Sequence, residues 1–150
     1  MTHSFKAHYF HLVWSTKNRK RIIKKDIQSN LYSYIGGIIK KRNGILLSAG
    51  GTDNHIHLLV SLKLPDQFSE LVRDVKANSS LWINKNSNNQ KRFAWQQGYS
   101  SFSVSYSGLA KVQLYIENQE EHHKIITFEE EFRRILIKHQ IKIDSRFVFD

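Results

Sequence analysis

Cysteine is absent from this chain of 150 residues, and proline and methionine occur once each. Without thiols, the chain cannot form disulfides, zinc ribbons or a cysteine nucleophile. No apolar run approaches the length of a membrane span, and the N-terminus lacks the hydrophobic stretch of a signal peptide. The single proline, Pro65, marks no linker. We therefore expect one domain over residues 1–150, located in the cytoplasm.

Acidic residues are also scarce, because 13 Asp and Glu face 23 Lys and Arg, for a net charge of +10. This excess indicates an anionic partner: nucleic acid first, an acidic membrane surface second. Two basic clusters are candidates for phosphate contacts, although a solvated loop is the plainer interpretation of each. The candidate DNA-binding residues are Lys17, Arg19, Lys20, Arg21, Lys91 and Arg92.

Hydrophobic periodicity predicts strands and helices in alternation. Asp26 is the expected N-cap of the first helix, a Gly50-Gly51-Thr52 turn joins the second and third strands, and Thr127 with Glu130 has capping-box spacing. The tail near 147–149 is a candidate edge strand. Strands are expected at 5–15, 45–49, 53–60 and 95–105, and helices at 26–42, 68–85, about 107–123 and from 127 onward.

The order β-α-β-β-α-β is that of the ferredoxin-like split βαβ arrangement. We therefore predict an α+β fold with an antiparallel sheet and two helices on one face. The strand at 53–60 would be central. The appended C-terminal helices would cover the other face.

This central strand carries the clearest chemical signal, a His-x-His pair. Side chains alternate along a strand, so His55 and His57 point the same way, with Cα atoms roughly 6.6 Å apart. Two imidazoles at that distance can bind one metal ion. Alternatively, they are two half-buried histidines of the core. Ile56 and Leu58 point to the opposite face and anchor the strand.

A metal ion needs further donors. The side-chain amide of Gln119 is the best candidate, with Asp53 and His122 as competitors. Imidazoles with an amide oxygen suit Mn²⁺ or Mg²⁺, and zinc would suit the imidazoles equally well.

A covalent nucleophile would have to be a hydroxyl. No Gly-x-Ser-x-Gly elbow is present, whereas a tyrosine can form a covalent intermediate. Tyr115 lies one helical turn before Gln119, so the two share a helix face. From spacing alone, a tyrosine at the edge of the core is the favoured interpretation. Tyr99 and Tyr106 are the alternative nucleophiles.

Five blocks in order along the chain resemble the single-tyrosine HUH transposases of the insertion-sequence 200/605 type, and most of all the REP-associated tyrosine transposases. They include Asp53-Asn54-His55-Ile56-His57 and Tyr115-Ile116-Glu117-Asn118-Gln119. A Met-Pro pair often precedes the histidines in this family, whereas Gly51-Thr52 stands there in this chain. The blocks cover 9–17, 53–60, 76–80, 95–105 and 115–123.

The resemblance implies that Tyr115, on the appended helices, is the nucleophile and that His55, His57 and Gln119 bind a divalent metal, Mg²⁺ or Mn²⁺. The implied activity is DNA transposition by cutting and rejoining single-stranded DNA with hairpins, through a 5′-phosphotyrosine. The resemblance and an exposed sheet edge favour a homodimer, with a monomer as the alternative. We expect no membrane partner. Trp95 and Tyr99 would stack on bases or simply pack.

Two other functions remain open. One is a domesticated, non-catalytic module that binds single-stranded nucleic acid, although the complete set of candidate site residues argues against it. The other is a metal-dependent phosphodiesterase that uses water directly, with Tyr115 in a structural role.

Overall fold

The computed structural model describes residues 3–86, 92–144, 146 and 148–149. The strands are β1 (Tyr9–Ser15), β2 (Gly44–Gly51), β3 (His55–Leu62) and β4 (Ser100–Val104). The helices are α1 (Lys25–Lys41), α2 (Phe68–Asn86), α3 (Leu109–Glu117), α4 (Gln119–His122) and α5 (Phe128–Lys138).

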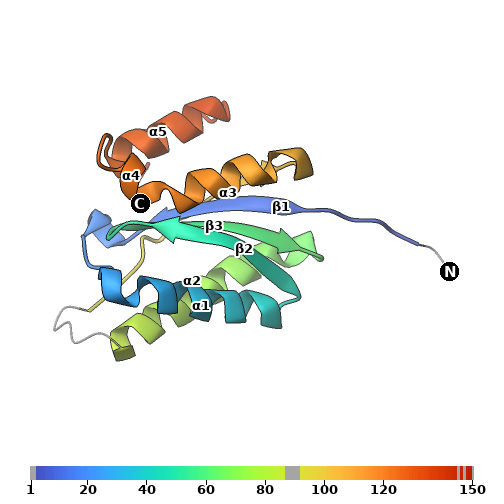
Figure 1. Ribbon diagram of the computed structural model, residues 1–150, viewed down its shortest axis with the longest axis horizontal. Helices are drawn as coiled ribbons and strands as arrows, with labels where there is room; N and C mark the ends of the chain where they lie inside the picture. The colour runs from blue at the N-terminus through green and yellow to red at the C-terminus, as the bar shows by residue number, and fades with distance from the viewer. Residues whose placement is uncertain (1–2, 87–91, 145, 147, 150) are drawn as a thin grey trace.

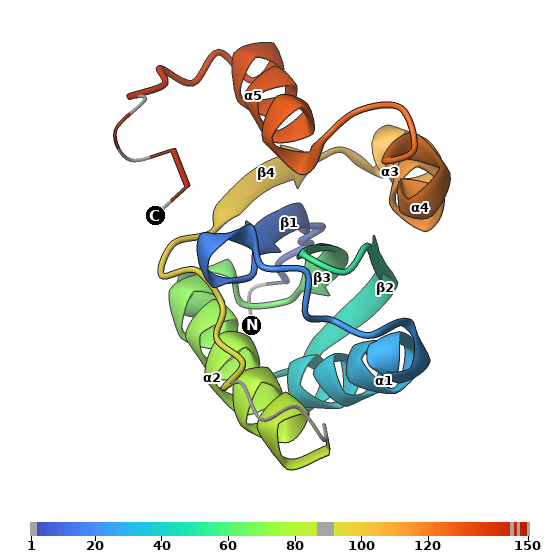
Figure 2. The ribbon, with the colours of Figure 1, turned by 90° about the vertical axis from the view of Figure 1, so that its left-hand side faces the viewer.

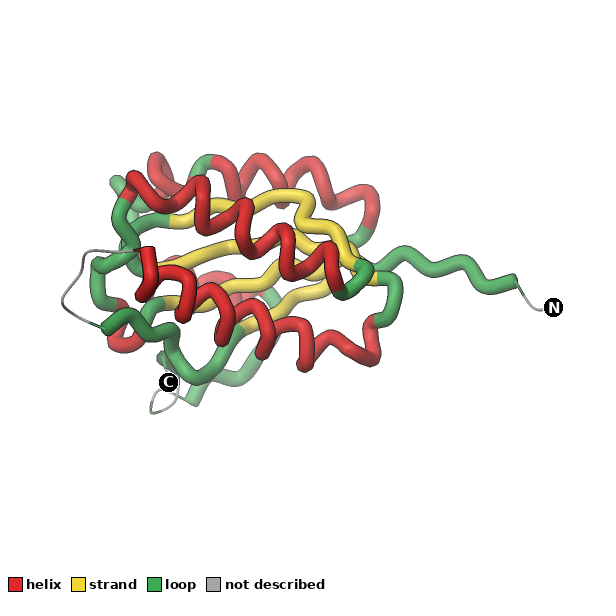
Figure 3. Tube along the Cα trace, turned by 90° about the horizontal axis from the view of Figure 1, so that it is seen from below, coloured by secondary structure: helices red, strands yellow, loops and turns green. Residues whose placement is uncertain are grey.

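The four strands form one antiparallel sheet in the order β2-β3-β1-β4. This is the order of a ferredoxin-like fold, so the predicted α+β architecture is confirmed. Figures 1 and 2 show the layers: α1 and α2 lie beneath the sheet, and α3, α4 and α5 lie above it. Seen from below in Figure 3, α1 and α2 run side by side across the strands.

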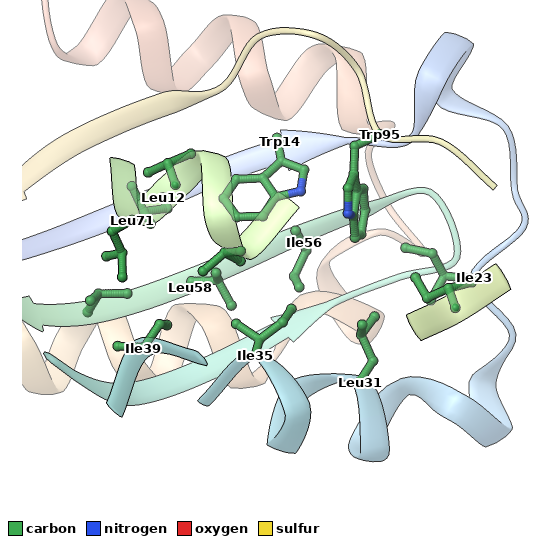
Figure 4. Packing of buried hydrophobic residues seen from close by; sticks show 14 of the residues in the cluster. Leu12, Trp14, Ile23, Leu31, Ile35, Ile39, Ile56, Leu58, Leu71 and Trp95 are labelled. Carbon is green, nitrogen blue, oxygen red and sulfur yellow. The ribbon is translucent and has the colours of Figure 1, made fainter. Parts of the chain in front are cut away.

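The main core lies between the sheet and the α1/α2 layer. Leu12 and Trp14 of β1 pair with Leu58 and Ile56 of β3, and these side chains meet the apolar stripe of α1. Figure 4 shows this packing, in which all four strand residues are at most 1% exposed. The period-2 patterns of β1 and β3 therefore predict correctly which side chains enter this core. The α1 contribution is Leu31, Ile35 and Ile39.

The β2–β3 hairpin differs from the prediction. Gly50 and Gly51 pair with His57 and Ile56, so both glycines belong to β2, and the turn falls after them. The reason lies above the sheet, where α3 packs directly on β2. A Cβ on Gly50 would lie 2.1 Å from the carbonyl oxygen of Ile116, so only glycine allows this approach.

The C-terminal region differs from the prediction in one place and agrees in another. The helix expected over 107–123 is interrupted after Glu117, because the backbone leaves helical geometry at Asn118 (φ −97°, ψ 20°) before α4 begins. The capping residue of α5 is confirmed, because Thr127 Oγ1 accepts a hydrogen bond from the Glu130 amide at 3.2 Å.

Two smaller predictions were wrong. Lys24, not Asp26, is the N-cap of α1, and Asp26 lies in the first turn, where its charge suits the helix dipole. The tail forms no edge strand at the described residues 148–149, because the Phe149 ring packs against Phe132 instead. Phe147 lies outside the described residues. None of the described helices combines the length and apolarity that a membrane span requires.

Candidate active site

The two histidines of β3 point toward the layer of C-terminal helices, as predicted. His55 and His57 are both fully buried, on the face opposite Ile56. His11 of β1 joins them from the adjacent strand, with its Nε2 2.8 Å from His57 Nδ1. This contact occupies the inner nitrogen of His57 and leaves Nε2 facing the helices. The sheet therefore presents two oriented imidazoles to α3, α4 and α5.

Two side-chain oxygens from the helices contact these imidazoles. Gln119, the first residue of α4, places its Oε1 2.9 Å from His55 Nε2. Glu131 of α5 places its Oε1 3.0 Å from His57 Nε2 and 3.6 Å from His55 Nε2. Both side chains are 1% exposed. The site thus contains the predicted amide and a carboxylate that we did not predict.

His123 is a further unpredicted member of the cluster. Its Nε2 lies 2.9 Å from Gln119 Oε1 and 3.1 Å from Glu131 Oε1. Its Nδ1 lies 2.9 Å from the carbonyl oxygen of Ile126 and must therefore carry a proton. If the ring is neutral, Nε2 carries a lone pair, and this lone pair faces Gln119 Oε1 and Glu131 Oε1.

The same argument applies to His55. Its Nδ1 lies 2.8 Å from Asn54 Oδ1, so with the amide in this orientation Nδ1 is the donor and Nε2 is a lone pair. Burial, together with the charge of His57, lowers the pKa of His55 to about 3, so this ring is neutral near pH 7. With a neutral His123 ring, lone pairs of His55, His123, Gln119 and Glu131 converge, and a positive centre among them would satisfy all four. Residues of these types are ligands for a divalent cation.

Tyr115 lies beside this cluster and contacts it through Glu131. Its hydroxyl donates a hydrogen bond to Glu131 Oε2, and Gln119 Nε2 donates to the same oxygen at 2.9 Å. Burial and the adjacent Glu131 carboxylate raise the pKa of Tyr115, so the hydroxyl is protonated at neutral pH. Glu131 therefore faces the imidazoles with one oxygen and the tyrosine with the other.

The charge on Glu131 is stabilised although the residue is buried. Burial alone would raise its pKa, but the close contacts with the His123 and His57 rings outweigh that cost and lower the pKa overall. A carboxylate held ionised among lone-pair donors adds negative charge to the cluster, which strengthens its attraction for a cation.

The alternative metal ligands and the alternative nucleophiles lie in less favourable positions. Asp53 lines a neighbouring cavity and is absent from the two groups of potential metal ligands among the described residues. His122 belongs to one of these groups, and its Nε2 lies 3.3 Å from Glu131 Oε2 without forming a hydrogen bond. Tyr106 is 76% exposed, and Tyr99 packs near Phe68 on the other side of the sheet.

The predicted DNA-binding residues fall into three groups. Lys17, Lys20, Arg21 and Arg92 are exposed. Arg19 is half-buried, and its Nε pairs with Glu129 of α5 at 3.1 Å. Lys91 lies outside the described residues. Trp95 is a core residue whose indole N–H donates to Ser79 Oγ at 2.9 Å, so packing is the correct interpretation for it.

Comparisons with known proteins agree with this architecture. The family described as "Transposase IS200 like" matches residues 4–119, so the chain belongs to this transposase family. The ISDra2 transposase TnpA of Deinococcus radiodurans is 22% identical over 117 residues, which cover 75% of this chain and 84% of the relative.

Two solved structures share the fold. One, from Deinococcus radiodurans and assigned as a transposase, is 21% identical, has a TM-score of 0.63, and is matched over 79% of this chain and 95% of its own. The other is a REP-associated tyrosine transposase solved bound to a REP hairpin. It is 16% identical, with a TM-score of 0.57, and is matched over 77% of this chain and 68% of its own.

Proposed function

We propose that this transposase-family chain is a metal-dependent single-strand DNA endonuclease and strand transferase that acts through a 5′-phosphotyrosine on Tyr115. The observation that carries the proposal is the joint contact of Tyr115 and the imidazole cluster with Glu131. The Glu131 side chain thereby links the proposed nucleophile to the proposed cation site. No other tyrosine of the described residues is hydrogen-bonded to this cluster.

His55, His57 and Gln119 would hold the cation, as the resemblance implies, and the converging lone pairs add Glu131 and His123 as donors. When bound, a divalent ion such as Mg²⁺ or Mn²⁺ supplies Lewis-acid polarisation of a phosphoryl oxygen. His11 and Asn54 fix the orientation of the two strand histidines from behind, which is the usual role of residues that contact metal ligands.

The reaction is a transesterification. The Tyr115 oxygen forms a bond to the phosphorus, the bond from phosphorus to the 3′-oxygen breaks, and the tyrosyl proton passes first to Glu131 Oε2. The 3′-oxygen leaves as a hydroxyl once it has gained a proton. One ester is exchanged for another, so a second 3′-hydroxyl can reverse the step and rejoin the strand without a nucleotide cofactor.

The substrate we propose is single-stranded DNA folded into hairpins. This rests on the net charge of +10 and on the exposed basic residues Lys17, Lys20, Arg21 and Arg92. A fold relative was solved with a REP hairpin, which supports the same class of ligand. Within the single chain of the structure, Tyr115 and the proposed cation donors contact the same Glu131 side chain.

The test replaces Tyr115 with Phe, which keeps the ring and deletes the attacking oxygen. With labelled single-stranded hairpin DNA and Mn²⁺, wild type should form a protein–DNA adduct that survives SDS and is destroyed by protease. Tyr115→Phe should bind DNA and metal but form no adduct. Tyr106→Phe is the matched control, because Tyr106 is exposed and has no hydrogen bond to the cluster among the described residues, and it should react like wild type.

Other outcomes identify other functions. Cleavage that leaves a free 5′-phosphate and no adduct would indicate a phosphodiesterase that uses water. DNA binding by wild type without any cleavage would indicate a domesticated binding module. An adduct formed by Tyr115→Phe would show that another residue is the nucleophile.

A further inference from the structure

A cavity of about 490 Å³ opens on the tyrosine side of the cluster, between β4, α3 and α5. Tyr115 and Glu131 form part of its wall, so it is continuous with the candidate active site. Its volume lies within the range of roughly 300–1,000 Å³ that is usual for small-molecule sites. Figure 2 shows the arrangement of these elements, with α5 above β4 and α3 at its side.

The lining combines an apolar floor with a basic rim. Phe102 of β4 and Val112 of α3 contribute apolar surface, and Phe102 is almost fully buried. The rim carries three cationic side chains that form no ion pair with any described residue: Lys111, Arg134 and Lys138. By contrast, Arg19 and Arg42 are already paired with acidic residues. The cavity therefore offers apolar contact together with positive charge on its rim, and the Glu131 carboxylate lies in its inner wall.

A nucleotide combines the complementary features, a flat base with little charge and a phosphate that carries it. Arginine and lysine are the usual partners of phosphate oxygens. Because Tyr115 lines the cavity, the part of the strand that becomes bonded to Tyr115 would remain in it after cleavage. That part is the nucleotide on the 3′ side of the cut.

We propose that this cavity binds the nucleotide whose 5′-phosphate is transferred to Tyr115, with the base against the apolar floor and the phosphate between Tyr115 and the basic residues of α5. The assignment rests on the proposed function and extends it to a defined subsite. Arg134 and Lys138 lie beyond residue 119, where the family match ends, so this wall of the subsite is built outside the matched region.

The experiment measures equilibrium binding of a thymidine trinucleotide labelled at its 3′ end, with either a 5′-phosphate or a 5′-hydroxyl. Wild type should prefer the phosphorylated probe by roughly fivefold or more, because the phosphate gains charge-assisted contacts. The double variant Arg134→Ala/Lys138→Ala should lose this preference. Both residues are exposed, so the fold should be retained.

Arg133→Ala is the matched control. Arg133 is on the same helix but faces the Phe149 ring, 5.5 Å away, instead of the cavity. It should keep the full preference. Val104→Trp, which enlarges a cavity-lining side chain on the same face of β4 as Phe102, should weaken the binding of both probes.

The subsite is wrong if the double variant keeps the preference, if Arg133→Ala loses it equally, or if wild type binds both probes alike. The readout needs no cleavage. Failure of adduct formation would therefore overturn the proposed function while leaving the binding result intact, and the reverse pattern would remove only the subsite.

Discussion

The two faces of the sheet are built from the same strands but hold opposite kinds of residue. Beneath the sheet, Trp14, Ile56 and Leu58 meet α1 and α2 in a cluster made of hydrophobic side chains. Above it, His55 and His57 meet Gln119 and Glu131, all of them at most 1% exposed. Adjacent residues of one strand thus serve different purposes on its two sides.

Burying polar groups costs free energy unless each is paired, whereas apolar burial stabilises the fold. The upper face therefore cannot be explained as a source of stability. It does contain a small apolar cluster of its own, in which Phe128 and Phe132 pack α5 onto Val13 and Phe102. We infer that stability resides mainly below the sheet and chemistry above it. Four predictions can break or sharpen this comparison.

The largest effect is expected from His57→Ala. Removing this imidazole deletes one cation donor and the hydrogen bond that Glu131 Oε1 forms with the sheet. Adduct formation should become undetectable and Mn²⁺ binding by calorimetry should weaken strongly, while DNA binding, which rests on phosphate contacts, should be kept. Full activity of wild type in EDTA would refute the metal mechanism.

Glu131→Gln should have the next largest effect. The amide keeps the shape of the side chain but cannot take the tyrosyl proton and carries no charge toward the cation. We expect adduct formation to slow by about 10²-fold or more, as for loss of a general base. Glu130→Gln, one residue away and exposed, is the control. Equal rates for the two variants would assign Glu131 a purely structural role.

Ile56→Ala tests the other side of β3. Loss of a fully buried side chain from the lower core should reduce the free energy of unfolding by about 2–5 kcal/mol, measured by urea denaturation. Under conditions where the variant is folded, it should bind Mn²⁺ like wild type. If metal affinity and stability fell together, the separation of the two faces would be wrong.

The fourth prediction is a dependence of stability on pH without metal. Burial, with the charge of His57, lowers the pKa of His11 and of His55 from 6.5 to about 3. The unfolded chain therefore binds more protons below pH 6.5, and stability is lost as the pH falls toward 3. In EDTA the slope should reach about 1.4 kcal/mol per pH unit for each histidine. His11→Gln should reduce it, and a flat profile from pH 7 to 5 would contradict the assignment.

The fold could be predicted from the sequence because local hydrophobic periodicity and the order of the elements specify it. The alternation along β3 and the helical stripe ending at Ile39 each specify one buried face. The errors fell where a distant contact decides the local structure. Gly50-Gly51 is a turn pattern by itself, and only the packing of Ile116 explains why it is a strand.

The site could be predicted in part. His55, His57, Tyr115 and Gln119 form compact patterns within 53–60 and 115–123, and the structure places them together. Glu131 was missed because it stands in the run Glu129-Glu130-Glu131, which is typical of a helix start.

One signal was present for Glu131, since it lies three residues after Phe128 and one before Phe132, on the apolar stripe of α5. An acidic residue at an apolar position is a sign of a functional contact. His123 carried no comparable signal, because its role depends on the path of the chain between α4 and α5.

The strict alternation of β3 also has a genetic consequence. An in-frame deletion of a single codon before His55 that slipped the strand by one position would exchange its two faces. Imidazoles would enter the hydrophobic core and isoleucine would enter the site, so fold and chemistry would be lost in one event. A selection for transposition should therefore tolerate conservative replacements along β3 far better than any single-codon change in its length.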